Sequence, residues 1–583
     1  MLFTSSLLLG TLGLLCLAGP LPPRSIAPTV HLQDTDIWFT GIATSKIESF
    51  LNIRFGEDTS GNNRFAPPKS YAYPAGSIVN ATQAGTACPQ RKVPLADFPV
   101  FDNLTNISED CLTLRIERPI NTSASDRLPV LVFIYGGGDT IGQIYDSAYE
   151  PSLLVAGAAQ RGLPIVYVAM NYRLGVFGFA SSPALNESDS LNVGLLDQRL
   201  ALWWIQDHIE AFGGDPDRVT IFGESDGATG VGLQLTAYGG QESKVPFRRA
   251  IMQSGGASAD PGTATTISAQ HTAELIEMVN CTSHGGSALS KSREELQCLR
   301  QLALPTLLST ANDYELTFDG GLDVFFPTSP STFVPDSPST LLKTGHFARG
   351  IDIISGWCEN DASLFTPTRI ASSSDVSEYL LGAYSGLSNA TIKKALELYP
   401  VSQFSNDTSA KPPVSAQYFR ASRMQRDLEY TCVSLLTAEA NARYATSSHV
   451  SNYLYVLNQT IFSAFFEKKG VPYYGVSHFS DIPYIFNSAS HGVYGSVATE
   501  SDRQLASAMG ASWASFATFG DPSRGNGTIT GWSRALPAGA GLGPSAPQLR
   551  VLGGSTPGNH YNEQLMERCA FWNSPHVLAE IGV

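Results

Sequence analysis

Residues 217–227 read DRVTIFGESDG, a short β-branched run that leads into a G-x-S-x-G turn around Ser225. This pattern predicts a nucleophile elbow, in which a strand ends, a sharp turn lifts the serine hydroxyl, and a helix begins at once. Gly223 and Gly227 are expected where two backbones approach so closely that a Cβ would collide. The motif occurs once in the chain, and its alternative interpretation is a surface turn rich in glycine and serine.

Two further apolar runs, LPVLVFIY at 128–135 and LPIVYVAM at 163–170, predict strands that are buried on both faces. Between the second run and the strand before Ser225, residues 194–209 carry Leu, Trp and Ile at helical spacing. Strand, helix and strand therefore alternate, which predicts an α/β fold. Catalytic groups in such folds lie at the carboxyl ends of strands, where Ser225 and the glycine run after 128–135 are found. Beyond about residue 260, Ser/Thr/Pro loops and short helices predominate, and the sequence does not order the strands.

Composition excludes some classes of protein. The chain has 583 residues, of which 43% are hydrophobic, so it can bury a large core. It has no internal repeat and no long linker, and we expect one domain over residues 19–583. The formal net charge is −15, which argues against a nucleic-acid partner because phosphates require a basic surface.

The N-terminus has the features of a secretory leader. An apolar run at 7–18 is too short to span a bilayer and matches a signal-peptide core, so residues 1–18 are predicted to be a signal peptide. Residues 576–583 hold neither a second apolar segment nor an ER-retrieval signal. The sequence therefore predicts a secreted, soluble glycoprotein without a stable membrane anchor. It has ten N-x-S/T sequons, at Asn80, Asn103, Asn106, Asn121, Asn186, Asn280, Asn389, Asn406, Asn458 and Asn526.

Several separated motifs point to one family. FGGDPDRVTIFGES at 212–225, SEDCLTL at 108–114, NYRLG at 171–175 and GLLDQR at 194–199 resemble the type-B carboxylesterase family of α/β-hydrolases, which includes cholinesterases and the large fungal lipases. The similarity extends from about residue 41 to 573. It implies an α/β-hydrolase fold, with a large, mostly parallel, twisted sheet covered by helices on both faces. The implied triad follows the chain order serine, acid, histidine.

A serine hydroxyl is a weak nucleophile at neutral pH and needs a base. The stretch GVSHFSDIPY at 475–484 resembles the family's histidine loop, which assigns the base to His478. His491, in the poorly matching SASHG, is the competing candidate. The histidines that lie far enough downstream of the serine are His449, His478, His491, His560 and His576.

The stretch IISGWCENDASLF at 353–365 resembles the segment that carries the family's acid, and its spacing places that acid at Asp361. The acid would hold the histidine tautomer and stabilise the imidazolium. Glu359 is the neighbour that could be mistaken for it, and it is expected to be a solvated loop carboxylate. Ser254 corresponds to a family serine bonded to the acid, or it is a turn hydroxyl. Glu224 and Ser254 are assigned to the surroundings of the triad.

The glycine run in YGGGD at 135–139 matches the family run whose second and third glycines donate N–H groups to the oxyanion. This resemblance assigns the oxyanion hole to Gly137 and Gly138, with the backbone N–H of Asp226 as the third donor. The family has a small residue at the position of Asp226 and an aromatic residue at that of Asp139. Two carboxylates there would oppose the developing charge, which implies slow turnover of simple esters or selection of a polar or cationic substrate. Alternatively, the Asp226 carboxylate points away and stabilises the start of its helix.

Eight cysteines are present, and Cys16 would leave with the signal peptide. The resemblance leaves Cys358 unpaired, as a small, buried, apolar side chain. It also implies a structural ion pair between Arg64 and Glu109. The disulfides that it implies, which suit an oxidising compartment, are Cys88–Cys111, Cys281–Cys298 and Cys432–Cys569.

The loop between Cys88 and Cys111 covers the entrance to the active-site gorge in this family. Here it has 22 intervening residues, two sequons and few large apolar side chains. A lid that opens at oil droplets should be longer and amphipathic, so an esterase is favoured over an interfacial lipase. The loop has no tryptophan to seat a quaternary ammonium, and choline esters are therefore not expected as substrates.

These features predict a secreted serine hydrolase that cleaves small-molecule carboxylic esters through an acyl-enzyme intermediate. No metal or organic cofactor is implied, and the sequence carries no signal for an oligomeric state. The alternative among enzymes is a lipase or sterol esterase. The alternative of another class is a non-catalytic, cholinesterase-like binding protein, against which the intact Ser225, Asp361 and His478 argue.

Overall fold

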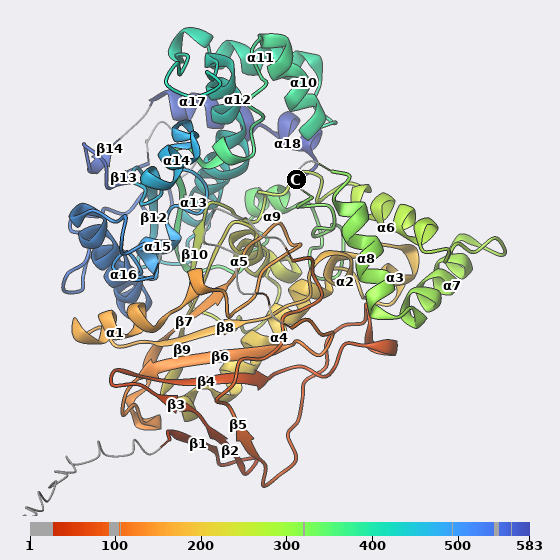
Figure 1. Ribbon diagram of the computed structural model, residues 1–583, viewed down its shortest axis with the longest axis vertical. Helices are drawn as coiled ribbons and strands as arrows, with labels where there is room; N and C mark the ends of the chain where they lie inside the picture. Colours follow the sequence, from red (N-terminus) through yellow and green to blue (C-terminus); the bar gives the residue numbers. More distant parts are fainter. Residues whose placement is uncertain are drawn as a thin grey trace, which may run out of the picture.

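The structure of the chain is a computed structural model in which helices pack against one large sheet, and a small sheet lies at the bottom of the view, below β3 and β4 (Figure 1). The predicted signal peptide and Asn103 lie outside the residues that it describes. The described residues are 27–92, 104, 106–318, 321–492, 494–540, 547–560 and 563–583.

The large sheet forms the centre of the fold. Its strands are β3 (Ile42–Ala43), β4 (Ile47–Arg54), β6 (Thr113–Pro119), β7 (Leu128–Ile134), β8 (Val166–Met170), β9 (Gly214–Glu224), β10 (Arg249–Gln253), β11 (Asp352–Cys358), β12 (Asn452–Leu457), β13 (Leu549–Leu552) and β14 (Gly558–His560). Across the sheet they follow the order β14-β13-β12-β11-β10-β9-β7-β8-β6-β4-β3. Neighbours from β8 to β13 pair in parallel, and the remaining pairs at the two edges are antiparallel. The small sheet holds β1 (Thr29–Leu32), β2 (Ile37–Thr40) and β5 (Ile78–Asn80).

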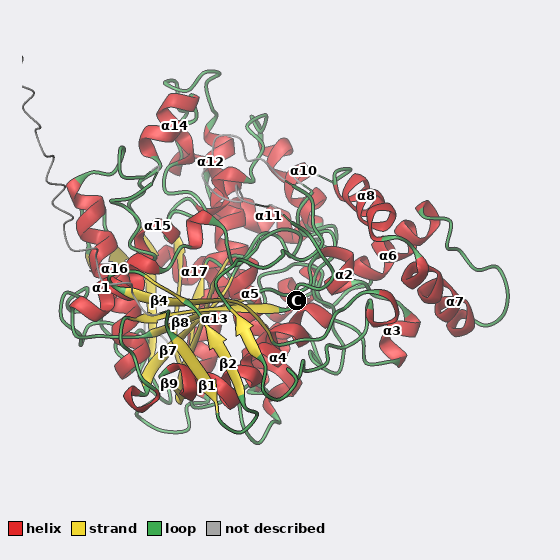
Figure 2. Cartoon of the chain, turned by 60° about the horizontal axis from the view of Figure 1, so that its bottom comes forward, coloured by secondary structure: helices red, strands yellow, loops and turns green. Residues whose placement is uncertain are grey.

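Helices cover both faces of the large sheet. They are α1 (Ser152–Gln160), α2 (Gly175–Phe179), α3 (Pro183–Glu187), α4 (Val193–His208), α5 (Asp226–Thr236), α6 (Ile267–Met278), α7 (Ala288–Gln301), α8 (Leu304–Glu315), α9 (Pro338–Thr344), α10 (Ser373–Ala383), α11 (Asn389–Leu398), α12 (Ala416–Arg426), α13 (Cys432–Arg443), α14 (Ser463–Lys469), α15 (Ile482–Ile485), α16 (Glu500–Phe519), α17 (Glu563–Trp572) and α18 (Pro575–Ile581). Figure 2 shows α1 and α16 on one side of the strands and α4 and α5 on the other. The fold is therefore α/β, as predicted, with a mostly parallel sheet between helical layers.

The strands nearest the elbow form where the apolar runs predicted them. β7 and β8 are buried along almost their whole length, as expected for strands that are covered on both faces. β8 begins at Val166, three residues later than predicted. β9 is longer than its β-branched run and begins at Gly214.

The region after residue 260 is more regular than the sequence suggested. It supplies β11 to β14, and its helices α10 to α13, α17 and α18 enclose a second hydrophobic core that includes Trp357, Tyr399 and Trp572. More than 90 residues separate β10 from β11, and β11 from β12. No local alternation of strand and helix marks these strands, because their pairing is set by contacts distant in sequence.

Covalent and ionic cross-links lie in the places that the resemblance implied. Arg64 and Glu109 form a buried, bidentate ion pair with N–O distances of 2.6 and 2.7 Å. Cys358 is free and buried. The disulfides of the described chain are Cys88–Cys111, Cys281–Cys298 and Cys432–Cys569.

The sequons lie mostly on the surface. Asn458 is half-buried, and the other described sequon asparagines are exposed. Among the described residues, no helix combines the length and the apolar character needed to cross a membrane.

Candidate active site

Ser225 lies at a strained turn between β9 and α5. Its φ of +59° falls in the left-handed region, which non-glycine residues seldom adopt. A Cβ on Gly223 would lie 2.4 Å from the backbone of Gly227, and a Cβ on Gly227 would lie 2.1 Å from the carbonyl oxygen of Ile134. The two glycines therefore allow the contact between β7 and the elbow, and the hydroxyl stands at the carboxyl end of β9.

His478 and Asp361 form a buried pair at the same edge of the sheet. His478 Nδ1 lies 2.8 Å from Asp361 Oδ1, and Asp361 Oδ2 accepts the backbone N–H of Cys358 at 2.7 Å. The centroids of the Phe365 and Tyr430 rings lie 5.2 and 5.1 Å from that of the imidazole. A buried carboxylate on Nδ1 fixes the imidazole so that Nε2 is the nitrogen available to a serine.

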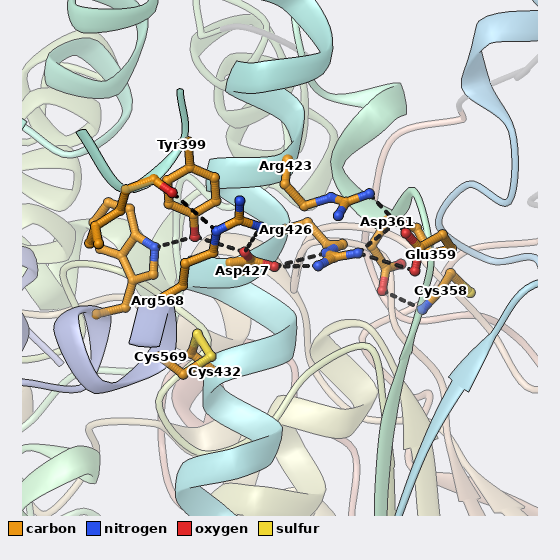
Figure 3. Close-up of polar contacts among 12 residues, drawn as sticks. Cys358, Glu359, Asp361, Tyr399, Arg423, Arg426, Asp427, Cys432, Arg568 and Cys569 are labelled. Carbon is orange, nitrogen blue, oxygen red and sulfur yellow. Dashed lines mark hydrogen bonds and ion pairs between the residues drawn. A yellow bond between two sulfur atoms is a disulfide. The ribbon is translucent and has the colours of Figure 1, made fainter. Parts of the chain in front are cut away.

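The two competing candidates lie elsewhere. Glu359 Oε1 is 2.8 Å from Arg423 Nη2, and Oε2 is 3.3 Å from Arg426 Nη1. Figure 3 shows Glu359 facing these two guanidinium groups. Glu359 is thus a paired carboxylate rather than a solvated one, and it is not the acid that contacts the histidine. His491 is exposed.

Glu224 brings a second carboxylate to the imidazole. Its Oε1 lies 3.2 Å from His478 Nε2, which is ion-pair range when the imidazole is protonated. Burial lowers the pKa of His478, but the charges of Glu224 and Asp361 outweigh burial and raise this pKa to about 9. Burial also holds the pKa of Glu224 well above the ordinary value for glutamate, so the two groups compete for protons, and the pair must lose a proton before His478 can act as a base.

The Ser225 hydroxyl faces Asp226 rather than His478. Its Oγ donates to Asp226 Oδ2 at 3.2 Å, and within the described structure His478 Nε2 receives no hydrogen bond. Catalytic hydrogen bonds often tighten only when substrate binds. A working triad therefore requires Ser225 Oγ to leave Asp226 and turn toward the imidazole.

The Asp226 carboxylate also accepts a hydrogen bond from a donor of the predicted oxyanion hole. Gly138 N–H donates to Asp226 Oδ2 at 2.5 Å. The glycine run passes beside the nucleophile, because a Cβ on Gly136 would lie 2.8 Å from Ser225 Cβ. An oxyanion would need the same Gly138 N–H, so the Asp226 side chain competes with it. The carboxylate does not turn away from the hole, which was the alternative that the sequence left open.

Asp226 lies close to three further aspartates, Asp139, Asp260 and Asp323. One carboxylate oxygen from each of Asp139, Asp226 and Asp260 lies within 4.8 Å of the other two, and the side chain of Asp323 is hydrogen-bonded to Asp226. Burial and the neighbouring charge of Asp226 hold the pKa of both Asp139 and Asp260 well above the ordinary value for aspartate. Asp139 was singled out from the sequence, but Asp260 was not, since it belongs to no motif and reaches the site only through the fold.

A further acid was also missed. Asp481 is fully buried, and its Oδ2 accepts hydrogen bonds from Gln253 Nε2 at 3.0 Å and from the Tyr455 hydroxyl at 3.1 Å. Burial, followed by the charge of Asp361, raises the pKa of Asp481 to about 6. Its position three residues after His478 was the one signal that could have identified it.

Ser254 has a different neighbour from the one that the family implied. Its hydroxyl makes no hydrogen bond to Asp361 in the part of the chain described, and it lies beside the thiol of Cys358. The second oxygen of Asp361 is satisfied instead by the backbone N–H of Cys358.

Comparison with known proteins identifies the family of the chain. Residues 39–542 match the carboxylesterase family. An inactive carboxylesterase-like protein of Byssochlamys spectabilis is 37% identical over 561 residues, which are 94% of this chain and 95% of that protein. A secreted lipase of Arthroderma benhamiae is 36% identical over 571 residues, which are 95% of this chain and 96% of the lipase.

A solved structure shares the fold. The crystal structure of EstA from Aspergillus niger covers 96% of this chain and 99% of its own, with a TM-score of 0.75 and 23% identity. Since the family match spans most of the chain, and relatives are 36–37% identical over almost its whole length, the chain belongs to the carboxylesterase family of α/β-hydrolases.

Proposed function

We propose that the chain is a secreted serine hydrolase that cleaves small-molecule carboxylic esters through an acyl-enzyme intermediate. The observation that carries this proposal is the 2.8 Å contact between His478 Nδ1 and Asp361 Oδ1, which lie at the same sheet edge as Ser225. Secretion is supported by the disulfides and by relatives that are named secreted lipases, and it agrees with the predicted signal peptide at 1–18.

The proposed reaction begins with proton transfer. His478 Nε2 takes the proton of Ser225 Oγ as the hydroxyl attacks the ester carbonyl, and Asp361 stabilises the imidazolium that results. His478 then returns the proton to the departing alcohol, which leaves an acyl group on Ser225. A water molecule, activated by the same imidazole, releases the carboxylic acid.

The oxyanion would lie on the backbone N–H groups of Gly137, Gly138 and Asp226. Each such donor contributes about 3–4 kcal/mol to stabilisation of the transition state. The Gly138 N–H becomes available only when the Asp226 carboxylate moves away from it. We therefore expect slow turnover of neutral esters, because the carboxylate both competes for this donor and repels the oxyanion.

A fluorophosphonate probe, which reacts with activated serines, tests the proposed function. The intact mass of the full chain should increase by one label, and Ser225→Ala should not react. Ser402→Ala, on the exposed surface, is the matched control and should react like the unaltered chain. If the chain is neither labelled nor active on a panel of esters of varied length and charge, the proposal is wrong.

A non-catalytic binding protein is the second candidate, and the contact between Asp226 and Gly138 specifically favours it. The relative from Byssochlamys spectabilis is itself named inactive. A protein of this kind would bind an ester or carboxylic acid beside Ser225 without releasing product. Ser225→Ala would then bind that ligand as tightly as the unaltered chain, with no turnover to lose.

A further inference from the structure

Three aspartates converge beside the nucleophile from three different segments. Asp139 follows β7, Asp226 begins α5, and Asp260 follows β10. One carboxylate oxygen of each lies within 4.8 Å of the others. Asp226 Oδ2 in turn lies 3.2 Å from Ser225 Oγ.

No cation of the described chain neutralises this cluster. None of the ion pairs among the described residues involves Asp139, Asp226 or Asp260. Asp139 is 3% exposed, and its Oδ2 has no hydrogen-bond partner. Asp260 accepts one hydrogen bond, from Thr229 Oγ1 at 3.2 Å, while its buried Oδ2 also lacks a partner. A buried carboxylate oxygen without a partner is costly unless a ligand satisfies it.

We propose that Asp139, Asp226 and Asp260 bind one hard divalent cation, Ca²⁺ or Mg²⁺, beside Ser225. Carboxylate oxygens are the ligands that these ions prefer. Two oxygens on opposite sides of a Ca²⁺ ion at about 2.4 Å each are about 4.8 Å apart, so oxygens no farther apart than these three can share one ion.

The cation has a consequence for the neighbouring groups. It would offset the charge that Asp226 places on the Gly138 N–H and near Ser225 Oγ. The site thus goes beyond the proposed hydrolysis, and its existence does not depend on Ser225 being reactive.

Isothermal titration tests the site on the full chain after treatment with a chelator and removal of that chelator. Ser225→Ala is used, so that binding is measured apart from any turnover. CaCl₂ and MgCl₂ are titrated in separate experiments, and at least one should bind in one equivalent with a Kd of about 1 mM or tighter. Asp139→Asn should weaken this Kd at least tenfold, while Asp313→Asn, an exposed aspartate on α8, should leave it unchanged.

Thermal unfolding supplies a second measurement. The cation should raise the Tm of the unaltered chain and of Asp313→Asn, but not that of Asp139→Asn or Asp260→Asn. Without metal, both asparagine variants should melt at or above the Tm of the unaltered chain, because each removes a repulsive charge. If one of them does not fold, the other decides by the same criterion.

Three outcomes would overturn the site. One is the absence of binding up to about 10 mM of either ion. Another is binding that survives unchanged in both Asp139→Asn and Asp260→Asn. The third is binding of tetramethylammonium, but of neither metal, to the unaltered cluster. Fluorophosphonate labelling stays a separate measurement, so failure of the metal site and failure of the proposed hydrolysis can be told apart.

Discussion

The two halves of the active site use the same type of side chain in opposite ways. In the acid–base half, the Asp361 carboxylate is neutralised by His478 and by the backbone N–H of Cys358. In the oxyanion half, which is the predicted oxyanion hole and its surroundings, the Asp226 carboxylate accepts a hydrogen bond from Gly138 N–H. Two other aspartates lie beside this carboxylate. Both halves stand at the carboxyl ends of parallel strands, so the difference arises from side chains and not from the scaffold.

We therefore do not expect family membership and a formed histidine–aspartate pair to be sufficient for an efficient esterase. Catalysis requires donors that are aimed at the charge developing in the transition state. In this chain a carboxylate already accepts one of those donors. The acid–base half therefore supports the proposed hydrolysis, and we expect the oxyanion half to limit its rate.

The largest expected effect tests whether the acid–base half works at all. Ser225→Ala should fold normally and lose about 10⁴-fold or more in kcat on any ester that the unaltered chain cleaves, since triad members act as a unit. Steady-state kinetics with an unchanged Tm would establish this. Retention of a tenth of the activity would remove Ser225 from the mechanism.

The second prediction separates Asp361 from Glu359. Asp361→Asn should lower kcat by about 10³- to 10⁴-fold, because it favours the wrong imidazole tautomer. Glu359→Gln is the matched control and should have little effect on kcat, since Glu359 pairs with Arg423 and Arg426 instead. The reverse pattern in the two variants would reassign the acid.

The third prediction uses pH. Because the pKa of His478 is raised to about 9, the imidazole carries its proton at neutral pH, and kcat/KM should increase up to that value. The increase is about tenfold per pH unit well below the pKa, or about 50-fold from pH 7 to 9, where half of the imidazole is deprotonated. Glu224→Gln should move the midpoint to lower pH, since it removes a charge that raises this pKa. A profile that is flat between pH 6 and 9 would contradict the role given to Glu224.

The fourth prediction targets the oxyanion half. A unit charge about 6 Å away at an effective dielectric constant near 20 opposes an oxyanion by about 3 kcal/mol before relaxation. Asp226→Ala should therefore raise kcat on a neutral ester by about 10- to 100-fold and weaken any preference for cationic esters. Asp217→Asn, on an exposed side chain, is the control for a change of net charge alone. If Asp226→Ala leaves the rates unchanged and lowers the Tm, the Asp226 carboxylate only stabilises the start of α5.

The last prediction is that one effect is absent, namely an increase in rate when the substrate forms droplets. Although relatives are named secreted lipases, the short loop between Cys88 and Cys111 predicts no interfacial activation. Most of the loop tip, at 93–103, lies outside the described residues, so this stays a prediction from sequence. The rate on a short-chain ester should follow simple saturation through the solubility limit, and a sharp rise when droplets form would instead indicate a lipase.

The local elements around the elbow could be predicted because their causes are local. The apolar runs became β7 and β8, and the helical spacing at 194–209 became α4 (Val193–His208). Gly223 and Gly227 were predictable because the motif demands a close backbone approach that the structure contains. β11, β12 and β13 were not predictable, since more than 90 residues separate each of them from the preceding strand of the large sheet.

The sequence by itself determined the family, the α/β fold and the residues from which an active site could be assembled. The tertiary structure alone decided that Asp226 faces Gly138, that Glu224 reaches His478, and that Asp260 joins the acidic cluster. A motif states which side chains are present, whereas their directions depend on rotamers and on the packing of segments that are distant in sequence. In this site the direction of the Asp226 carboxylate determines whether the Gly138 N–H, a donor of the predicted oxyanion hole, is available to a ligand.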